Sequence, residues 1–168
     1  MDFARAKTSI RDRLRAPGTI AAIVVTLLPL LYFLPATRGH LIISPDDGVI
    51  QNIPFRVAVA NQIHSGAVPF WNPSLFCGMP LLAAAQAGVL FPLNWFYVAF
   101  NPRTATNLMM LSAYMVAALG AYLCARRSGS SVAGAGLTSL VWQAGGFLVA
   151  QIGHTNIVHT AAMLPWLF

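Results

Sequence analysis

The chain alternates between long apolar runs and one long polar loop. Residues 18–36, 104–125 and 131–150 are uncharged and mostly apolar. A helix needs about 20 apolar residues to cross the hydrocarbon core of a bilayer. The three runs therefore predict membrane-spanning helices, and residues 157–168 begin a fourth, partial span.

Two details of these runs predict how the helices pack. Pro29 lies within the first run and predicts a kink, which membrane helices tolerate when neighbouring groups satisfy the freed backbone. The third run is rich in small side chains, namely Ala133, Gly134, Ala135, Gly136, Gly145 and Gly146. Small residues let membrane helices approach closely, so we expect this helix to be buried in a bundle.

Residues 37–103 form a loop between the first and second spans. Loops of this length are uncommon and are usually functional. Ser44 is a typical N-cap, Pro45 suits the first helical position, and Asp46 and Asp47 favour a first helical turn. The sequence therefore predicts that a helix begins at Ser44.

The loop also predicts surface helices. From 49 to 63, apolar residues recur at helical spacing among polar ones, Arg56 included, and Pro54 predicts a bend. This pattern is typical of an amphipathic helix that lies on the membrane surface. Residues 81–90 predict a second short surface helix. The aromatic residues between 91 and 100 are typical of the head-group region.

The composition agrees with an integral membrane protein. Of the 168 residues, 57% are hydrophobic and only 8% are charged, whereas soluble domains carry about 25% charged residues. The net charge of +6 does not indicate nucleic-acid binding, because the basic residues cluster beside apolar runs. Cys77 and Cys124 match no metal-binding spacing, and their places in a loop and in a span argue against a disulfide.

Basic residues also orient the chain. The N-terminal arm and Arg126-Arg127 are positive and fall on one side, which the positive-inside rule makes cytoplasmic. The long loop and the turn at His154 then face outward. The chain ends in an apolar stretch too short to span, so we expect an N-terminal fragment of a larger protein. The whole chain, 1–168, is interpreted as one all-α membrane domain.

A distinctive set of spaced residues runs through the loop and beyond it. It comprises Asp47-Gly48, Gln51, Pro54-Phe55, Gly66, Pro69-Phe70-Trp71-Asn72-Pro73, Gly78, Pro80, Gln86, Phe91-Pro92, Gly153-His154 and Leu164-Pro165-Trp166. This pattern resembles the YfhO-like family of bacterial membrane proteins, a branch of the C-type glycosyltransferases. The resemblance covers most of residues 44–168.

The resemblance implies a fold and an activity. It implies a multi-spanning enzyme of the bacterial cytoplasmic membrane that takes its sugar from a polyprenyl-phosphate donor. The acceptor would be an extracytoplasmic glycan or lipid. Such enzymes carry an acidic residue in the first outer loop, and Asp47, followed by glycine, is the matching position. They also have many more spans than this chain contains, so we expect this chain alone to be inactive and transfer to require the longer parent protein.

Asp46 and Asp47 are the candidate catalytic residues. A bland alternative is that they only complement a helix N-terminus, which is worth about 0.3–1 kcal/mol. The functional alternative is a carboxylate that accepts the proton of an acceptor hydroxyl, or that holds Mg²⁺ or Mn²⁺ against a donor phosphate. The resemblance favours Asp47 as base or metal ligand, and we assign Asp46 mainly to the helix start.

Other residues are candidates for substrate binding. Arg56, His64 and Arg103 could neutralise a lipid phosphate, although interfacial solvation explains each equally well. Trp71 and Asn72 could contact a sugar, or could form an aromatic turn at the interface. His154 lies in an outer turn on the side of Asp47. The resemblance adds two amides, Gln51 and Gln86.

Two classes of function follow from these observations. The first is a glycosyltransferase that uses membrane lipid, a polyprenyl-phosphate sugar and a glycan or lipid acceptor. The second is a non-catalytic membrane protein that binds lipid head groups or aids polymer export. Asp47 distinguishes them, because only the enzyme needs its carboxylate.

Overall fold

The computed structural model describes residues 16–38, 41–75 and 77–168, and these are mostly helical. The basic N-terminal arm lies almost wholly outside the described residues. The helices and strands of the first half are α2 (Pro17–Leu27), α3 (Pro29–Tyr32), α4 (Leu34–Thr37), the π-helical turn η1 (Gly48–Asn52), α5 (Ile53–His64), β1 (Trp71–Asn72) and β2 (Met79–Pro80). Those of the second half are η2 (Ala85–Ala87), η3 (Pro92–Trp95), α6 (Phe96–Ala99), α7 (Pro102–Arg127), α8 (Val132–Ala144), α9 (Gly146–Ala150), α10 (Thr155–Met163) and η4 (Leu164–Leu167).

Two helical segments are long and apolar enough to cross a membrane. They are α7 and the α8–α9 segment, Val132–Ala150. The first predicted span is shorter, because its helix is interrupted at Leu28, just before Pro29, and again at Phe33, just before Leu34-Pro35. Prolines remove backbone donors and clash with the preceding turn, so the run becomes three short helices.

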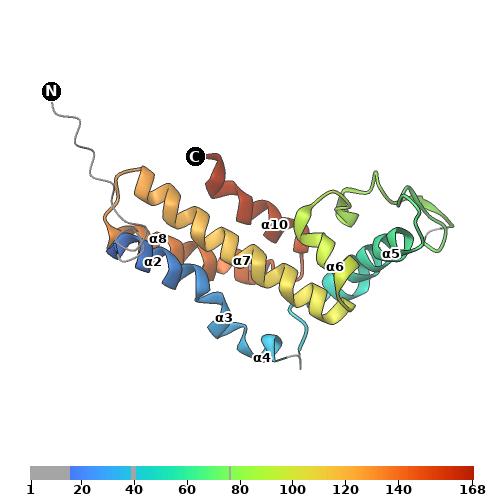
Figure 1. Ribbon diagram of the computed structural model, residues 1–168, viewed down its shortest axis with the longest axis horizontal. Helices are drawn as coiled ribbons and strands as arrows, with labels where there is room; N and C mark the ends of the chain where they lie inside the picture. The colour runs from blue at the N-terminus through green and yellow to red at the C-terminus, as the bar shows by residue number, and fades with distance from the viewer. Residues whose placement is uncertain (1–15, 39–40, 76) are drawn as a thin grey trace.

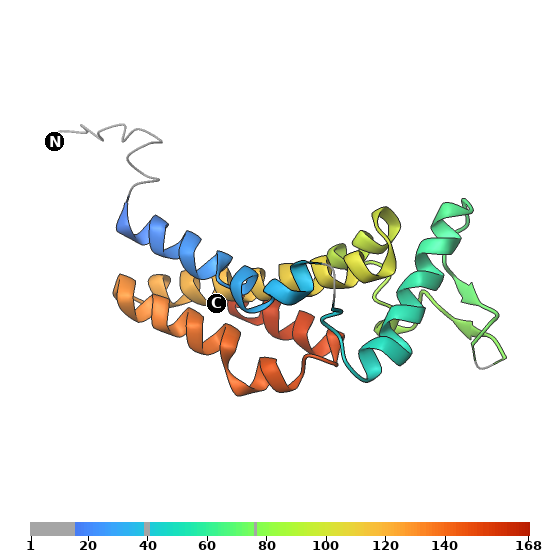
Figure 2. The same cartoon turned by 90° about the horizontal axis from the view of Figure 1, so that it is seen from below.

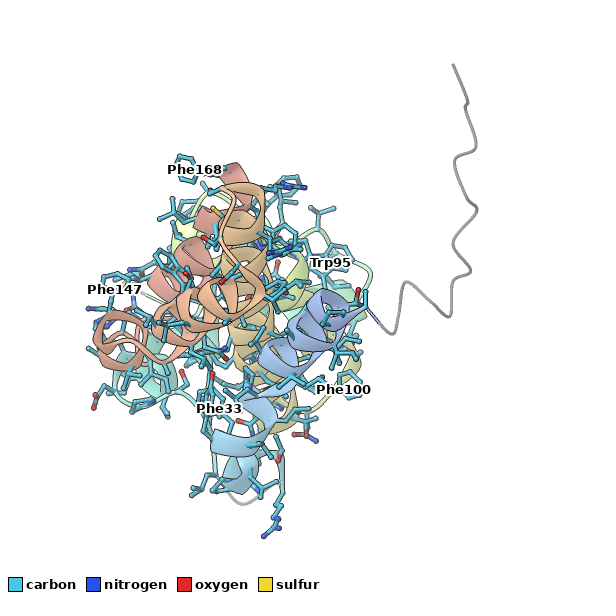
Figure 3. All side chains as sticks on the ribbon, turned by 90° about the vertical axis from the view of Figure 1, so that its left-hand side faces the viewer. Phe33, Trp95, Phe100, Phe147 and Phe168 are labelled. Carbon is cyan, nitrogen blue, oxygen red and sulfur yellow. The ribbon has the colours of Figure 1, made fainter. Side chains whose placement is uncertain are left out.

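The long helix α7 is the centre of the fold. In Figure 1, α10 lies on one side of α7, while α3 and α4 turn away on the other. Figure 3 looks along this arrangement and shows Phe33 and Phe168 on opposite sides of it, with Phe147 at its flank. The buried side chains of α7 in the main core are Ala105, Met109, Met110, Ala113, Tyr114 and Ala117.

The expectation that the third span is buried in a bundle is wrong for the described chain. Its face toward α7 is buried at Ala135 and at Ser139, whose hydroxyl donates to the carbonyl of Ala118 at 2.8 Å. The opposite face is open, with Leu137 and Val141 both more than 60% exposed. The segment also breaks at Gly145, whose backbone is extended.

The long loop folds into a compact unit beyond the Pro102 end of α7 (Figure 2). Helix α5 lies steeply inclined to α7. It is followed by the short antiparallel pair β1 and β2, in which Trp71 pairs with Pro80. A core of Phe55, Val59, Leu81, Ala87 and Val89 holds the unit together. The predicted helix over 81–90 is wrong, because only the single turn η2 forms there.

The predicted amphipathic surface helix is corrected in two ways. The part of it from Val49 to Asn52 forms the π-helical turn η1, and the α-helix begins only at Ile53. Arg56, expected on the polar face, is only 1% exposed. The helix therefore buries Phe55, Arg56 and Val59 against the loop and the bundle, and it is not a simple apolar stripe.

Candidate functional site

Two glycines bring the long loop against the turn before α10. A Cβ on Gly48 would lie 1.8 Å from the Ser44 hydroxyl oxygen and 3.4 Å from the carbonyl oxygen of Gly153. A Cβ on Gly153 would lie 3.0 Å from the carbonyl oxygen of Pro45. No side chain fits at either position without displacement, so these glycines let two distant segments touch.

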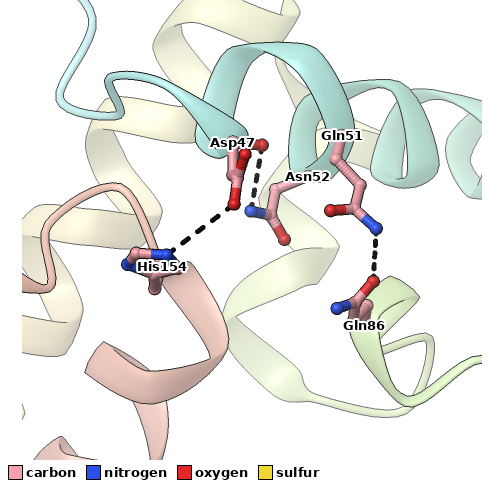
Figure 4. A network of polar contacts seen from close by, with 5 residues as sticks. All are labelled: Asp47, Gln51, Asn52, Gln86 and His154. Carbon is pink, nitrogen blue, oxygen red and sulfur yellow. Dashed lines mark hydrogen bonds and ion pairs between the residues drawn. The ribbon is translucent and has the colours of Figure 1, made fainter.

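This contact places Asp47 beside His154. The Asp47 Oδ2 atom lies 3.7 Å from His154 Nε2, which is an ion pair when the imidazole is protonated (Figure 4). Asn52 donates from Nδ2 to the carbonyl of Asp47 at 3.2 Å, and Gln51 donates to the side-chain oxygen of Gln86. Together these residues line an open polar cavity of about 120 Å³.

The helix start differs from the prediction. The helix begins at Gly48, with Asp47 rather than Ser44 as its N-cap residue, and the buried Ser44 hydroxyl has no hydrogen-bond partner among the described residues. Asp46 adopts a left-handed conformation with φ of 50°, and its carbonyl accepts from the N–H groups of Val49 and Ile50. Asp46 therefore sets the turn by its backbone and does not line the cavity.

The N-terminus of α10 opens into the same cavity. Thr155 and Asn156 line it, and Thr155 is completely buried with no hydrogen-bond partner for its hydroxyl in the described chain. No described side chain caps this helix. The first N–H groups of a helix carry partial positive charge and favour oxygen-rich anions. The cavity therefore offers unused donors next to a carboxylate.

Arg56 lies buried beneath this cavity. Its guanidinium donates to Asn94 Oδ1 at 2.7 Å, to the carbonyl of Asn52 at 2.9 Å and to Asn156 Oδ1 at 3.2 Å. These acceptors are all neutral. Burial lowers the pKa of Arg56 to about 10, so the group stays cationic at neutral pH. The floor of the site thus holds a positive charge with neutral partners.

The cation also fixes how the amides point. Because Arg56 takes the side-chain oxygen of Asn156, the Nδ2 group of that amide is left to face the cavities that it lines. In the same way Asn52 turns Nδ2 to Asp47, and Asn94 turns Nδ2 to the carbonyl of Gly88 at 2.7 Å. Arg56 is therefore a positioning residue, not a surface ligand.

Two apolar grooves follow α10 away from the polar cavity. One, of about 360 Å³, lies between α10 and the loop, where His159 stacks on Phe91 with ring centroids 4.4 Å apart. The other, of about 390 Å³, is lined by Trp142 and Phe147 on its far wall. Asn156 lines both grooves and the polar cavity, so polar and apolar surfaces meet at this residue.

The structure gathers part of the predicted set. Four residues line the polar cavity, namely Asp47, Gln51, Gln86 and His154. His64 does not join them, since its Nε2 atom donates to the carbonyl of Val98 at 2.7 Å. Arg103 lines a separate cavity with Leu30 and Leu111. It therefore does not belong to this site.

The hairpin residues also lie apart from the cavity. Trp71 is 53% exposed and lies over Gly78, where a Cβ would be 2.6 Å from its ring. Asn72 is buried, and its side-chain oxygen accepts from the N–H of Ser74 at 2.9 Å. Neither side chain reaches the polar cavity, so the sequence-based grouping of Trp71 and Asn72 with Asp47 is not seen here.

Sequence reasoning missed Asn52, Asn94, Thr155 and Asn156. Amides and hydroxyls among apolar residues give little signal in a sequence. The role of the three amides becomes visible only in the structure, where their oxygens accept hydrogen bonds from a buried cation. Among the described residues, no three His, Cys, Asp or Glu side chains gather where they could hold a metal ion. Comparisons of the chain with protein-family models, curated proteins and solved structures find no match.

Proposed function

We propose that the protein is a membrane glycosyltransferase. It transfers a sugar from a polyprenyl-phosphate donor to a glycan or lipid on the outer face of the bacterial cytoplasmic membrane. The chain crosses that membrane several times, with its N-terminus in the cytoplasm and the long loop outside. The observation that carries the proposal is the meeting of Asp47 and His154 over a polar cavity from which two apolar grooves lead away.

The grooves suit a donor with a long apolar chain. The isoprenoid chain lies along α10, where the lining is almost wholly apolar. The phosphate lies at the N-terminus of α10, within reach of the Nδ2 group of Asn156. The buried charge of Arg56 behind this donor favours an anion, because few solvent molecules screen it there.

Asp47 then accepts the proton of the acceptor hydroxyl. The acceptor oxygen forms a bond to the anomeric carbon of the sugar as the bond from that carbon to the phosphate oxygen breaks. Polyprenyl phosphate leaves with the bonding electrons, and the proton stays on Asp47 until solvent removes it. His154, when protonated, holds the carboxylate in place. General-base help of this kind contributes about 10²–10⁴-fold in rate.

A divalent metal fits this site only in part. Mg²⁺ commonly uses one or two carboxylates together with phosphate oxygens and water. Asp47 supplies a single carboxylate and His154 an imidazole, and the described residues gather no third His, Cys, Asp or Glu side chain with them. A metal would therefore depend on the donor phosphate for its remaining ligands.

One observation favours the alternative function. The polar cavity of about 120 Å³ is smaller than the usual range of about 300–1,000 Å³ for small-molecule sites. A non-catalytic protein that binds a lipid head group, or that aids polymer export, would need no more room than this. That protein would hold the phosphate in the same place and would not require the base.

Asn156→Asp tests where the donor phosphate binds. The new carboxylate can pair with Arg56, so the protein should fold with unchanged or higher thermal stability in detergent. It removes the amide donor and adds a negative charge, so binding of a polyprenyl phosphate should fall about tenfold or more, as expected for the loss of one charge-assisted contact. Asn61→Asp, at an exposed position of α5, is the matched control. Unchanged binding in Asn156→Asp would contradict this placement.

A further inference from the structure

Asn107 is a buried amide near the start of α7, and its side chain belongs neither to the polar cavity nor to the grooves along α10. Only 7% of its surface is exposed. A buried amide costs free energy unless its donors and its acceptor are satisfied. In a helix that the proposed topology places in the membrane, water does not satisfy them. The partners of this side chain therefore indicate its role.

Asn107 bonds three backbone groups of one stretch of the chain. Its Oδ1 atom accepts from the N–H of Ile43 at 2.9 Å. Its Nδ2 group donates to the carbonyls of Ala36 and Leu41 at 3.0 and 2.9 Å, so both amide donors are used. Residues 41–45 of this stretch form no helix or strand. One side chain of α7 therefore supplies hydrogen bonds that regular secondary structure would otherwise provide.

The stretch leads directly into the candidate base. Ile43 lies four residues before Asp47, and its side chain is buried in the main core. On the other side, Asn52 donates from Nδ2 to the carbonyl of Asp47 at 3.2 Å. The backbone around Asp47 is thus held at two points, by Asn107 before the turn and by Asn52 after it.

We propose that Asn107 is a positioning residue for the Asp47 carboxylate. Apolar packing of Ile43 keeps the stretch against α7, but it is non-directional and does not fix how the backbone is turned. Hydrogen bonds do fix it, because each has a preferred length and angle. A displacement of about 1 Å at a reacting group can lower a rate about 10²-fold. A residue outside the cavity can therefore govern transfer.

This inference rests on the proposed function for the role of Asp47, but the hydrogen bonds can be tested without any substrate. Hydrogen exchange of the full gene product in detergent measures them. In the wild-type protein we expect the N–H of Ile43 to exchange at least about tenfold more slowly than an unprotected amide. Asn107→Leu should remove most of that protection. Fast exchange at Ile43 in the wild-type protein would overturn the proposal, whether or not the variant folds.

Thr106→Val is the matched control. Thr106 is completely buried on the same helix, and its hydroxyl bonds the carbonyl of Pro102 and the hydroxyl of Tyr97 instead of the stretch before Asp47. This variant loses a buried polar group of α7, as Asn107→Leu does, but it should leave Ile43 protected. Equal loss of protection in the two variants would mean that the exchange reports general loosening of α7, and it would contradict the proposal.

Sugar transfer by the full gene product tests the positioning role. At matched amounts of folded protein, Asn107→Leu should lower kcat about 10²-fold and leave KM for the polyprenyl-phosphate sugar unchanged, because the donor contacts along α10 are not altered. Thr106→Val should keep both values. Asn107→Asp keeps the oxygen that accepts from Ile43 but neither amide donor, so its kcat should be intermediate.

Two outcomes separate this inference from the proposed function. Wild-type kcat in Asn107→Leu, after Ile43 has lost its protection, would contradict the positioning role alone. If Asp47→Asn transfers sugar at the wild-type rate, the proposed function fails, while the protection of Ile43 by Asn107 is still measured independently.

Discussion

The carboxylate of Asp47 lies 3.7 Å from the imidazole of His154, although the two residues come from different loops of the chain. Glycines make this contact, because Gly48 and Gly153 leave no room for a Cβ where the two segments cross. A pair assembled in this way from distant segments is held by the fold. Substitutions at other positions that push the two segments apart should therefore separate the pair.

Substitution of Gly48 by alanine should separate the pair. The added methyl group overlaps the Ser44 side chain, and overpacking of this kind costs about 1–3 kcal/mol. We expect lower thermal stability in detergent and weaker binding of polyprenyl phosphate. Gly136→Ala, where nothing lies within 4 Å, is the control and should be neutral.

The double variant Ser44→Gly with Gly48→Ala identifies the cause. Removing the Ser44 side chain deletes the atoms that the new methyl group would meet. Stability should therefore recover toward that of Ser44→Gly alone. If the double variant is as unstable as the sum of the single variants, the overlap with Ser44 is not the reason.

The buried cation predicts an asymmetric response to mutation. Asn94→Leu removes the acceptor of the shortest Arg56 hydrogen bond and leaves the charge buried, which should cost about 1.5–3 kcal/mol. Arg56→Met removes the charge itself and should cost less, since replacing a buried ion by an apolar group is often neutral. Unfolding in detergent measures both, with Asn61→Leu on the exposed face of α5 as the control.

Adding Arg56→Met to Asn94→Leu should therefore restore much of the lost stability. Burial lowers the pKa of Arg56 only to about 10, so Arg56 stays charged near neutral pH. The stability lost in Asn94→Leu, and its recovery in the double variant, should therefore not change with pH near neutrality. A double variant less stable than Asn94→Leu alone would mean that the cation stabilises the loop through contacts other than these amides.

The two cysteines test the orientation of the chain. Cys77 is exposed at the tip of the hairpin, and Cys124 lies near the Arg126 end of α7. A membrane-impermeant maleimide applied to intact cells should modify Cys77 and spare Cys124. After the membrane is opened, Cys124 should become reactive in proportion to its partial exposure. Labelling of Cys124 alone in intact cells would invert the proposed topology.

The sequence predicted some elements well for physical reasons. The stretch 104–125 is uncharged and has no internal proline, and it forms one continuous helix within α7. The first run, with Pro29 and Pro35, has the apolar composition of a membrane span, but it forms three short helices and not one continuous helix. Composition alone does not show whether neighbouring groups will satisfy a backbone that a proline interrupts.

The site was predictable only in part. Asp47, Gln51, Gln86 and His154 were candidates from the sequence, and all four line one cavity. Arg56 was placed on a solvated face, since an arginine in a helical pattern usually lies there. Its burial depends on Asn52, Asn94 and Asn156, and no periodicity reveals that three separate amides will converge on one cation.

The exchange of Asp47 for asparagine tests most directly whether the Asp47 carboxylate is the base of a sugar transfer. Asparagine keeps the size and serves equally well at a helix start, but it lacks the charge and the basic oxygen. Asp46→Asn is the matched control, because asparagine also tolerates the left-handed backbone found there.

The measurement is product formation from a polyprenyl-phosphate sugar in membranes that contain equal amounts of each variant, with the substitutions made in the full gene product. We expect Asp47→Asn to reduce transfer by about 10²-fold or more while expression and folding persist. Asp46→Asn should keep most of the activity. Transfer at the wild-type rate by Asp47→Asn would contradict the catalytic role of this carboxylate and would favour a protein that only binds lipid head groups.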